Sequence, residues 1–371
     1  MKNISLEKSF RLVLKIGSSL LIKNNKFDKD WLETLIEDLI FFRKQNIEII
    51  IVASGSVSLG KNHLNIKKNK VKIQEKQAFA ACGQVILMNN FMKILKKKKI
   101  NVAQILLTYS DTEDRKKSIN SRETIKELLK LGILPIINEN DSVAIDELKF
   151  GDNDRLAARV AQISNSDFLI LLSDVAGLYT SNPKKNKSAK LLKFVEEIDK
   201  KILKMASMET NLYGTGGMKT KLEAAKIAMS SGCSTIICKG NRKNPIQKYF
   251  KNNHGTIFIS KKKCANNIKN WIAGSVKPLG KVVVDSGAKI ALKNGASLLP
   301  IGVIKVFGSF LKGDIIKIES IKGEELGKGI SHYDCNELKK IKGKKTSDLK
   351  NILGYHGRDE IIHRDFLKLN D

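Results

Sequence analysis

Six short apolar runs, separated by segments of helical periodicity, constrain the fold of this chain more than any other feature. The runs are apolar along most of their length, which predicts strands at Arg11–Ile16, Ile47–Ala53, Val102–Thr108, Leu134–Asn138, Asp167–Ser173 and Thr235–Lys239. Amphipathic helices are expected between them, near residues 28–44, 75–97, 118–131, 153–164 and 218–231. Because such strands are buried on both faces, the sequence predicts a mostly parallel sheet between helices, a three-layer αβα sandwich of the α/β class.

The pattern changes near Trp271. After the segment KPLGK, the sequence KVVVDSGAKIALKNGASLLPIGVIKV contains short β-rich runs broken by Gly and Pro. Such spacing is typical of a small, β-rich, barrel-like domain. We therefore expect two domains, a larger one over residues 1–265 and a β-rich one over residues 278–362.

The net charge of +29, from 67 basic and 38 acidic residues, raises the possibility of a nucleic-acid partner. Only nine of the basic residues are Arg, and the lysines are spread along both domains, which favours a solvated lysine-rich surface instead. The five cysteines form no C-x-x-C pair and fit reduced thiols better than disulfides or a zinc site. The apolar runs are too short to span a bilayer, and Lys15 inside the first run argues against a secretory signal. We expect a cytoplasmic protein with no membrane association.

Polar residues stand at the carboxyl ends of the predicted strands, where parallel sheets bind their ligands. Lys15 lies inside the first apolar run, where a charge is costly unless it has an anionic partner. The other strand ends and the helix start at residue 153 supply Ser54, Gly55, Asn138, Asn140, Asp141, Asn153, Asp154, Ser173 and Asp174. Each residue alone is explained as a helix cap or a tight turn. Together they indicate a polar site along one edge of the sheet.

The segment YGTGGMKTKLEAAK, beginning at Tyr213, reads as a glycine-rich turn that opens a helix. It matches neither the P-loop nor the dinucleotide-binding pattern. Free backbone N–H groups at a helix N-terminus nevertheless attract anions, and Lys219 and Lys221 add positive charge. A plain flexible loop is the alternative interpretation.

Phosphoryl transfer is the chemistry that these features indicate. The transferred group carries spread negative charge, so positioning and charge neutralisation dominate its catalysis. Lys15 and Lys221 are the candidates for approaching it from opposite sides, and Asp154 is the candidate for holding both lysines. A carboxylate acceptor is already ionised and needs no general base, which agrees with five His residues that lie outside all of these turns.

Several longer motifs carry a family resemblance. VLKIGSS, IVASGSVSLG, AACGQ, INENDSVA, GDND, LLSDVAGLYT and GTGGMKTKLEAA resemble the amino acid kinase family, and most of all its glutamate 5-kinase branch. VVVDSGAKIALKNGASLLPIGV and FLKGDIIKI resemble a PUA domain. The resemblance implies the amino acid kinase fold followed by a PUA-like barrel. It also implies ATP-dependent phosphorylation of the γ-carboxylate of L-glutamate to L-glutamyl 5-phosphate, the first step of proline biosynthesis.

The resemblance implies a role for each matching position. Lys15, Lys221 and Asp154 would be catalytic. The substrate would be bound by Ser54, Gly55, Asp141 and Asn153, the last two at its α-amino group. ATP would be bound by Lys15, Ser173, Asp174, Thr215, Gly216, Gly217, Met218, Lys219, Thr220 and Lys221. Mg²⁺ would accompany ATP, and no residue is assigned to it.

Some positions depart from the family pattern. Lys219 stands where a small residue is common, and Ser56 stands where alanine is common. Ser173 replaces a frequent threonine but keeps the hydroxyl group. None of these departures changes the reaction type that the resemblance implies.

The same resemblance implies a homo-oligomer, dimer or tetramer, with proline as feedback inhibitor and glutamyl phosphate reductase as the enzyme that takes up the product. Sibling kinases for acetylglutamate or aspartate are one alternative, and the PUA-like tail argues against them. An RNA-binding PUA protein is another. The tail carries only two Arg, at 358 and 364, and few aromatic residues, so RNA binding stays open only as a side activity.

Overall fold

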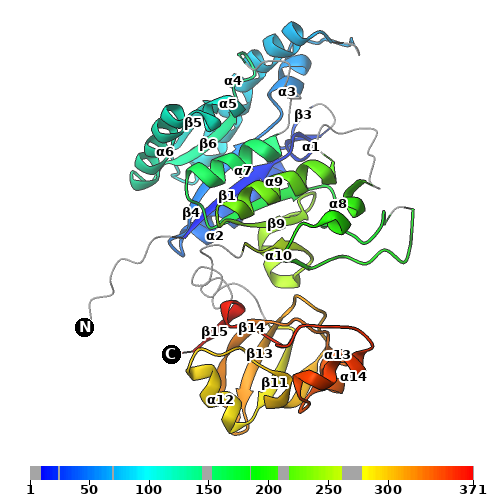
Figure 1. Ribbon diagram of the computed structural model, residues 1–371. Helices are drawn as coiled ribbons and strands as arrows, with labels where there is room; N and C mark the ends of the chain where they lie inside the picture. Colours follow the sequence, from blue (N-terminus) through cyan, green and yellow to red (C-terminus); the bar gives the residue numbers. More distant parts are fainter. Residues whose placement is uncertain are drawn as a thin grey trace, which may run out of the picture. The chain divides into compact units, whose positions relative to one another are not determined.

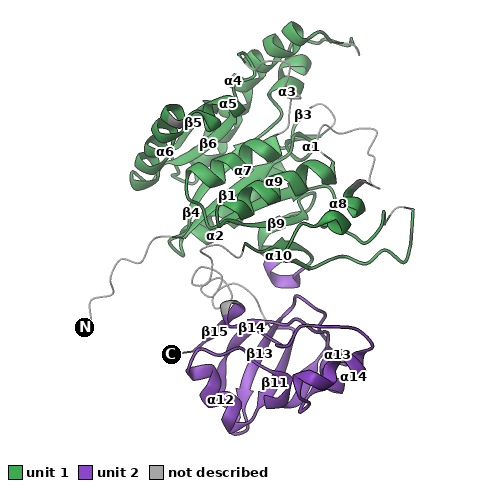
Figure 2. Ribbon diagram, viewed as in Figure 1, with its two compact units in different colours: residues 1–249, 254–262 green, residues 250–253, 263–371 purple. Residues whose placement is uncertain are grey.

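Figure 1 shows the computed structural model of the chain. The structure describes residues 10–23, 26–68, 71–143, 153–183, 185–207, 217–260 and 278–370. Contacts divide the chain into two compact units, residues 1–249 with 254–262 and residues 250–253 with 263–371 (Figure 2). Each unit has a hydrophobic core of its own.

An eight-stranded sheet forms the centre of the first unit, in the order β5-β6-β4-β1-β7-β9-β10-β8. Its first six strands are parallel: β5 (Val102–Leu107), β6 (Leu134–Glu139), β4 (Glu48–Ala53), β1 (Arg11–Ile16), β7 (Phe168–Ser173) and β9 (Ser234–Lys239). β10 (Gly255–Phe258) then runs antiparallel to β9, and β8 (Phe194–Val195) runs parallel to β10. The six predicted strands and the mostly parallel sheet are confirmed. β8 and β10 escape prediction because they are only two and four residues long.

Helices lie on both faces of this sheet, as predicted (Figure 1). The five predicted helices are present as α2 (Lys29–Arg43), α4 (Ile73–Lys97), α6 (Arg115–Lys130), α7 (Asn153–Ile163) and α9 (Met218–Ser230). Five shorter helices accompany them: α1 (Ser18–Leu21), α3 (Ser56–His63), α5 (Tyr109–Glu113), α8 (Lys200–Ser207) and α10 (Pro245–Asn252). A small hairpin joins β2 (Ile22–Lys23) to β3 (Lys26–Phe27). The apolar sides of α7 and α9 share one core with alternate residues of β1, β4 and β7.

Helix α4 is the one described helix that is long and apolar enough, by length and composition, to cross a membrane. This qualifies the expectation drawn from the short apolar runs. Half of its apolar window is buried, and Phe79, Leu87 and Phe91 belong to the core of the protein. Buried core helices also meet this criterion of length and apolar composition, so the finding is only weak support for a membrane span.

A five-stranded sheet forms the second unit, in the order β12-β11-β13-β14-β15. The strands are β11 (Gly280–Val284), β12 (Val303–Gly308), β13 (Ile315–Ser320), β14 (Glu325–Ile330) and β15 (Leu367–Leu369). The neighbouring helices are α12 (Ser286–Lys293), α13 (Cys335–Ile341), α14 (Leu349–Leu353) and three short 3₁₀ turns, η1 (Pro300–Gly302), η2 (Thr346–Asp348) and η3 (Arg364–Phe366). The β-rich character expected from the sequence is confirmed, with β12 and β15 as the two ends of the strand order.

Candidate active site

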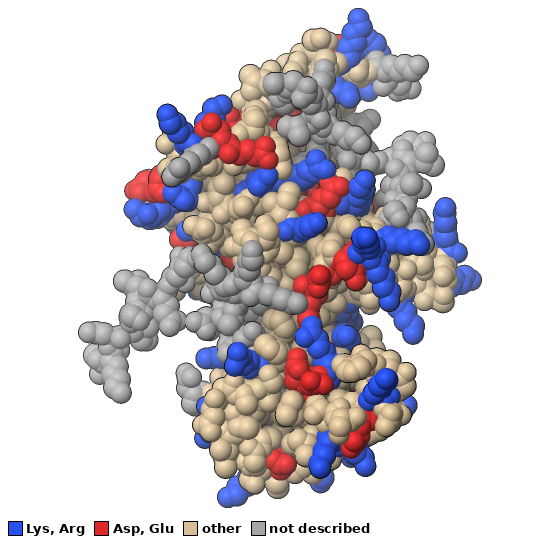
Figure 3. All heavy atoms as spheres, viewed as in Figure 1, with Lys and Arg blue, Asp and Glu red and all other residues tan. Residues whose placement is uncertain are grey.

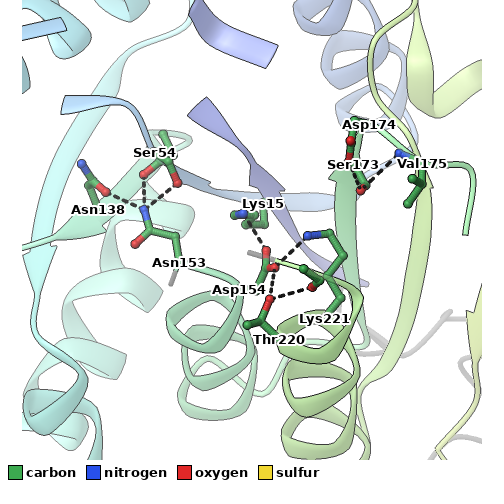
Figure 4. Close-up of polar contacts among 12 residues, drawn as sticks. Lys15, Ser54, Asn138, Asn153, Asp154, Ser173, Asp174, Val175, Thr220 and Lys221 are labelled. Carbon is green, nitrogen blue, oxygen red and sulfur yellow. Dashed lines mark hydrogen bonds and ion pairs between the residues drawn. The ribbon is translucent and has the colours of Figure 1, made fainter. Parts of the chain in front are cut away.

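A buried carboxylate held between two lysines lies at the centre of the first unit (Figure 4). Asp154, in the first turn of α7, is only 1% exposed. Its Oδ1 lies 2.6 Å from Lys15 Nζ of β1, and its Oδ2 lies 3.0 Å from Lys221 Nζ of α9. Thr220 Oγ1 lies 3.2 Å from the same Oδ2. The structure thus brings together the three residues predicted to act on the transferred group, and their catalytic roles stay a prediction.

Two opposing effects set the pKa of Asp154. Burial raises the pKa of this carboxyl group because it disfavours the charged form. The charges of Lys15 and Lys221 and their hydrogen bonds outweigh burial and hold the pKa well below its usual range. Asp154 is therefore ionised throughout the physiological range, and it keeps two ammonium groups fixed in a site with little water.

The local sequence explains why Lys15 can occupy a central strand. Its neighbours Leu14 and Ile16 are fully buried, and β1 pairs with β4 on one side and β7 on the other. An unpaired ammonium group there would be strongly unfavourable. The ion pair with Asp154 removes that cost and fixes the direction of the lysine side chain.

Lys15, Asp154 and Lys221 form a triad of charged side chains. Helices α7 and α9 hold Asp154 and Lys221 in place. Small side chains such as Ala157 and Ala225 are fully buried in the core that the two helices share. Next to the triad, Arg155 Nε donates to Glu223 Oε2 at 3.0 Å. The ion pair joins the same two helices one residue after Asp154 and two after Lys221.

An amide network borders the triad on the β4 side (Figure 4). Asn153 Nδ2 lies 2.8 Å from the Ala53 carbonyl oxygen, 2.9 Å from Ser54 Oγ and 2.8 Å from Asn138 Oδ1. Asn153 is nearly completely buried, and its Oδ1 has no hydrogen-bond partner among the described residues. The predicted substrate residues Ser54 and Asn153 are therefore in direct contact.

Ser56 extends this network to Asp141, and Asn138 Nδ2 lies 3.5 Å from Ser56 Oγ. Ser56 Oγ donates to Asp141 Oδ2 at 3.0 Å, and both residues are buried. Burial raises the pKa of Asp141, and the hydrogen bond from Ser56 partly offsets that rise. The departure from the family pattern at Ser56 thus supplies a hydrogen bond to a predicted substrate-binding carboxylate.

Helices α3 and α4 touch at two glycines, and this contact sets the position of Ser56. A Cβ added at Gly83 would meet the Ser56 carbonyl oxygen at 1.8 Å, and one added at Gly60 would meet the Phe79 carbonyl oxygen at the same distance. Only glycine permits such a close backbone approach. Gly55 precedes α3 with φ of +111°, a conformation that also favours glycine.

The expected nucleotide-binding residues are described only in part. At the end of β7, Ser173 Oγ donates to Asp174 Oδ1 at 3.2 Å, and Val175 N donates to Ser173 Oγ at 3.4 Å (Figure 4). Thr215 and Gly216 lie outside the described residues.

The rest of the glycine-rich turn opens α9. Gly217 is the N-cap of the helix, and a Cβ added there would meet no atom within 4 Å. Met218 is buried and packs in the core, whereas Lys219 is exposed. Thr220 contacts Asp154, as described above. Within this segment, the side chains of Thr220 and Lys221 are the ones that the structure brings to the triad.

Two residues of the network were not among the predicted site residues. Asn138 was noted only as a strand-end residue, yet it joins Asn153 to Gln84, whose Oε1 accepts from Asn138 Nδ2 at 2.8 Å. Gln84 is buried, and its Nε2 has no hydrogen-bond partner among the described residues. The motif AACGQ contains Gln84, so the signal was present, but the motif alone does not show which way a helix side chain points.

Among the residues that the structure describes, no group of three His, Cys, Asp or Glu side chains is placed to hold a metal ion. Asp154 is occupied by two lysines, and Asp174 is an exposed carboxylate beside the nucleotide-binding candidates. Mg²⁺ is commonly bound by one or two carboxylates together with substrate phosphates. The residues present fit an ion carried by the phosphates of a nucleotide.

Comparison with known proteins gives two family matches. The model of the amino acid kinase family matches residues 10–239. The chain belongs to the amino acid kinase family. The model of the PUA domain matches residues 280–353, within the second unit.

Curated glutamate 5-kinases are similar to this member of the amino acid kinase family over nearly its whole length. The protein from Pelagibacter ubique is 48% identical over 355 residues, covering 95% of this chain and 96% of the relative. The protein from Allorhizobium ampelinum is 43% identical, covering 97% and 92%. The protein from Brucella ovis is 43% identical, covering 96% and 95%. The expected resemblance is thereby confirmed for both units of the chain.

Proposed function

We propose that this amino acid kinase transfers the γ-phosphoryl group of ATP to the γ-carboxylate of L-glutamate, forming L-glutamyl 5-phosphate, the first step of proline biosynthesis. The single observation that carries the reaction type is the placement of Lys15 and Lys221 on the two oxygens of one buried carboxylate. The choice of glutamate is supported by glutamate 5-kinases that are 43–48% identical over nearly the whole chain.

The two lysines would neutralise charge on the transferred group. Phosphoryl transfer spreads negative charge over three oxygens, and fixed cations stabilise that charge without reorganising. Asp154 keeps Lys15 and Lys221 at set positions through the two ion pairs. Thr220 supports the same carboxylate from α9.

The nucleotide would lie between the end of β7 and the start of α9. We propose Ser173, Asp174 and the segment from Thr215 to Lys221 as its binding residues. Mg²⁺ bound to the phosphates would neutralise part of their charge, with Asp174 as the exposed carboxylate beside them.

The acceptor would lie against the amide network. Asp141 would hold the α-ammonium group of glutamate by a charge-assisted hydrogen bond. Asn153, Ser54 and the backbone at Gly55 would hold the rest of the amino acid. The γ-carboxylate is ionised at neutral pH and is already nucleophilic, so no general base is required.

Further proposals follow from the family resemblance. We propose a cytoplasmic homo-oligomer, inhibited by proline, whose product is taken up by glutamyl phosphate reductase. We also propose domain limits of 1–265 for the kinase and 278–362 for the PUA-like domain.

A hydroxylamine trap tests the reaction. The purified chain is incubated with ATP, Mg²⁺ and, separately, glutamate, aspartate and N-acetylglutamate, and the hydroxamate formed from any acyl phosphate is measured. Hydroxamate with glutamate alone is the expected result. Hydroxamate with another acid alone would replace the proposed substrate, and none with any acid, in folded protein that binds ATP, would contradict acyl-phosphate chemistry.

A further inference from the structure

One row of side chains on the second unit contains four lysines and a phenylalanine. Strand register pairs Phe307 of β12 with Lys281 of β11, Lys281 with Lys317 of β13, Lys317 with Lys328 of β14, and Lys328 with Lys368 of β15. Paired residues on neighbouring strands point to the same face of a sheet. The row therefore crosses all five strands, over about 19 Å at about 4.8 Å per strand.

Adjacent like charges in a sheet are unfavourable, and only part of this charge is offset. Glu319 lies 2.8 Å from Lys281 Nζ and 2.6 Å from Lys317 Nζ, and Glu325 lies 3.5 Å from Lys317 Nζ. Lys328 has no ion-pair partner in the part of the chain that the structure describes. The three lysines that line the hollow, Lys281, Lys317 and Lys328, are set against Glu319 and Glu325, which leaves this group with a net charge of +1.

The row borders a surface hollow of about 390 Å³. Its lining includes Lys281, Phe307, Lys317, Glu325 and Lys328. Phe307 is 45% exposed, and Lys281 Nζ lies 5.2 Å from the centre of its ring. Cations and an exposed aromatic ring thus share one shallow surface hollow, far along the sequence from the candidate active-site residues.

We propose that this hollow binds a free nucleoside phosphate, with its phosphates on Lys281, Lys317 and Lys328 and its base against Phe307. Lysine ammonium groups are effective phosphate ligands, and a base gains stabilisation by stacking on an aromatic side chain. Binding an anion also relieves the repulsion within the lysine row. The volume lies within the range of small-molecule sites.

The same observations favour a free nucleotide over a nucleic-acid strand. Strand-binding surfaces offer several aromatic platforms along a continuous basic groove. Here Phe307 is the sole aromatic residue in the lining of the hollow, and Glu319 and Glu325 lie beside the row and pair with its lysines. On the face of the second unit that Figure 3 shows, basic and acidic side chains both occur.

Equilibrium dialysis of the full chain against radiolabelled ADP tests the proposal. We expect two ADP molecules per chain at saturation, one in the kinase domain and one in the hollow. Lys281→Gln with Lys328→Gln should weaken the second site by about 10-fold or more, because two charge-assisted contacts are lost. Lys328→Gln alone, which leaves every recorded ion pair intact, should weaken it by about 3-fold to 10-fold.

A second arm separates base recognition from charge. Phe307→Ala should weaken ADP binding at the hollow by about 5-fold or more through lost stacking, and should leave pyrophosphate binding there unchanged. The matched control is Lys339→Gln with Lys340→Gln, two exposed lysines of α13 outside the hollow. This control should leave both ADP sites intact.

Several results would overturn the proposal. These are a single ADP site in the wild-type chain, an equal loss of ADP in the α13 control, and an equal loss of pyrophosphate in Phe307→Ala. A further contrary result would be a ten-nucleotide single-stranded RNA that binds the hollow more tightly than ADP, with an affinity that falls with salt as steeply as contact with several phosphates requires. That result would assign the hollow to a nucleic-acid strand. Lys221→Ala identifies which ADP site belongs to the kinase domain, so failure of this proposal is distinguishable from failure of the proposed reaction.

Discussion

The two halves of the candidate active site use carboxylates in opposite ways. Asp154 is buried between two lysines, and their charges lower its pKa despite burial. Asp141 is also buried, but its recorded partner is the Ser56 hydroxyl, and burial raises its pKa. The first carboxylate is already neutralised and organises cations. The second has no cation beside it among the described residues, which suits a site that awaits an ammonium group from a ligand.

The largest effect is expected from removing the charge of Asp154. Asp154→Asn leaves two buried ammonium groups without a counter-charge, which should lower the free energy of unfolding by about 3–5 kcal/mol. Because the pKa of Asp154 is lowered, its contribution is present above about pH 4 and is lost as pH falls through the lowered pKa. Urea unfolding at pH 7 and pH 5 should show a similar gap between wild type and variant. A gap below 1 kcal/mol at pH 7 would contradict the buried ion pairs.

Lys221→Ala tests whether the lysines held by Asp154 contribute to catalysis. It should lower kcat by about 100-fold to 1,000-fold, the usual cost of removing one group that stabilises transition-state charge. The apparent KM for glutamate should change little. Steady-state kinetics and thermal unfolding measure both effects, with Lys226→Ala, an exposed lysine of the same helix, as the control. Near-normal kcat in Lys221→Ala would remove this residue from the catalytic set.

Asp141→Asn tests the second carboxylate of the comparison, the one that has no cation beside it among the described residues. The loss of a charge-assisted hydrogen bond to the α-ammonium group should raise the KM for glutamate by about 10-fold to 100-fold. The effect on kcat should be smaller, in contrast with Lys221→Ala. An unchanged KM for glutamate would separate Asp141 from substrate binding and break the comparison between the two carboxylates.

Ser56→Ala should have the smallest effect and the most specific one. Losing this hydrogen bond should raise the KM for glutamate by about 3-fold to 5-fold. The carboxylate must be ionised to hold an ammonium group, so affinity falls as pH drops through the raised pKa of Asp141. Since the hydrogen bond from Ser56 lowers that pKa, its removal should shift the acid limb of kcat/KM to higher pH. Ser58→Ala, an exposed serine of the same helix, is the control, and superimposable pH profiles would exclude the positioning role.

The sequence predicted the sheet well because its central strands are continuous apolar runs. It also pointed to Lys15 and Asp154, since a charge inside such a run requires a partner. It named Asp154 as the candidate partner, but it could not give the contact itself, because Lys15 and Asp154 lie far apart in the chain and meet only when α7 packs on β1. Capping and turn chemistry alone would also explain Asn153 and Ser54.

The substrate side was harder to predict for a different reason. The hydrogen bond from Ser56 to Asp141 depends on the crossing of α3 and α4, which no periodicity in the sequence reveals. Gly60 and Gly83 look like weak positions in helices when they are considered one at a time. Gln84 joins the network only because that crossing turns its side chain toward Asn138.

The backbone contact at Gly60 and Gly83 has a mechanical consequence. Helices that meet through long side chains can slide, because rotamers absorb the shift. Here the contact is main chain against main chain, so α3 and α4 must move as one lever. A shift of the 25-residue α4 would therefore be expected to displace Ser56 at the start of α3 as well. The far end of α4 is thereby connected to the Ser56–Asp141 hydrogen bond through main-chain contacts, without a relay of side chains.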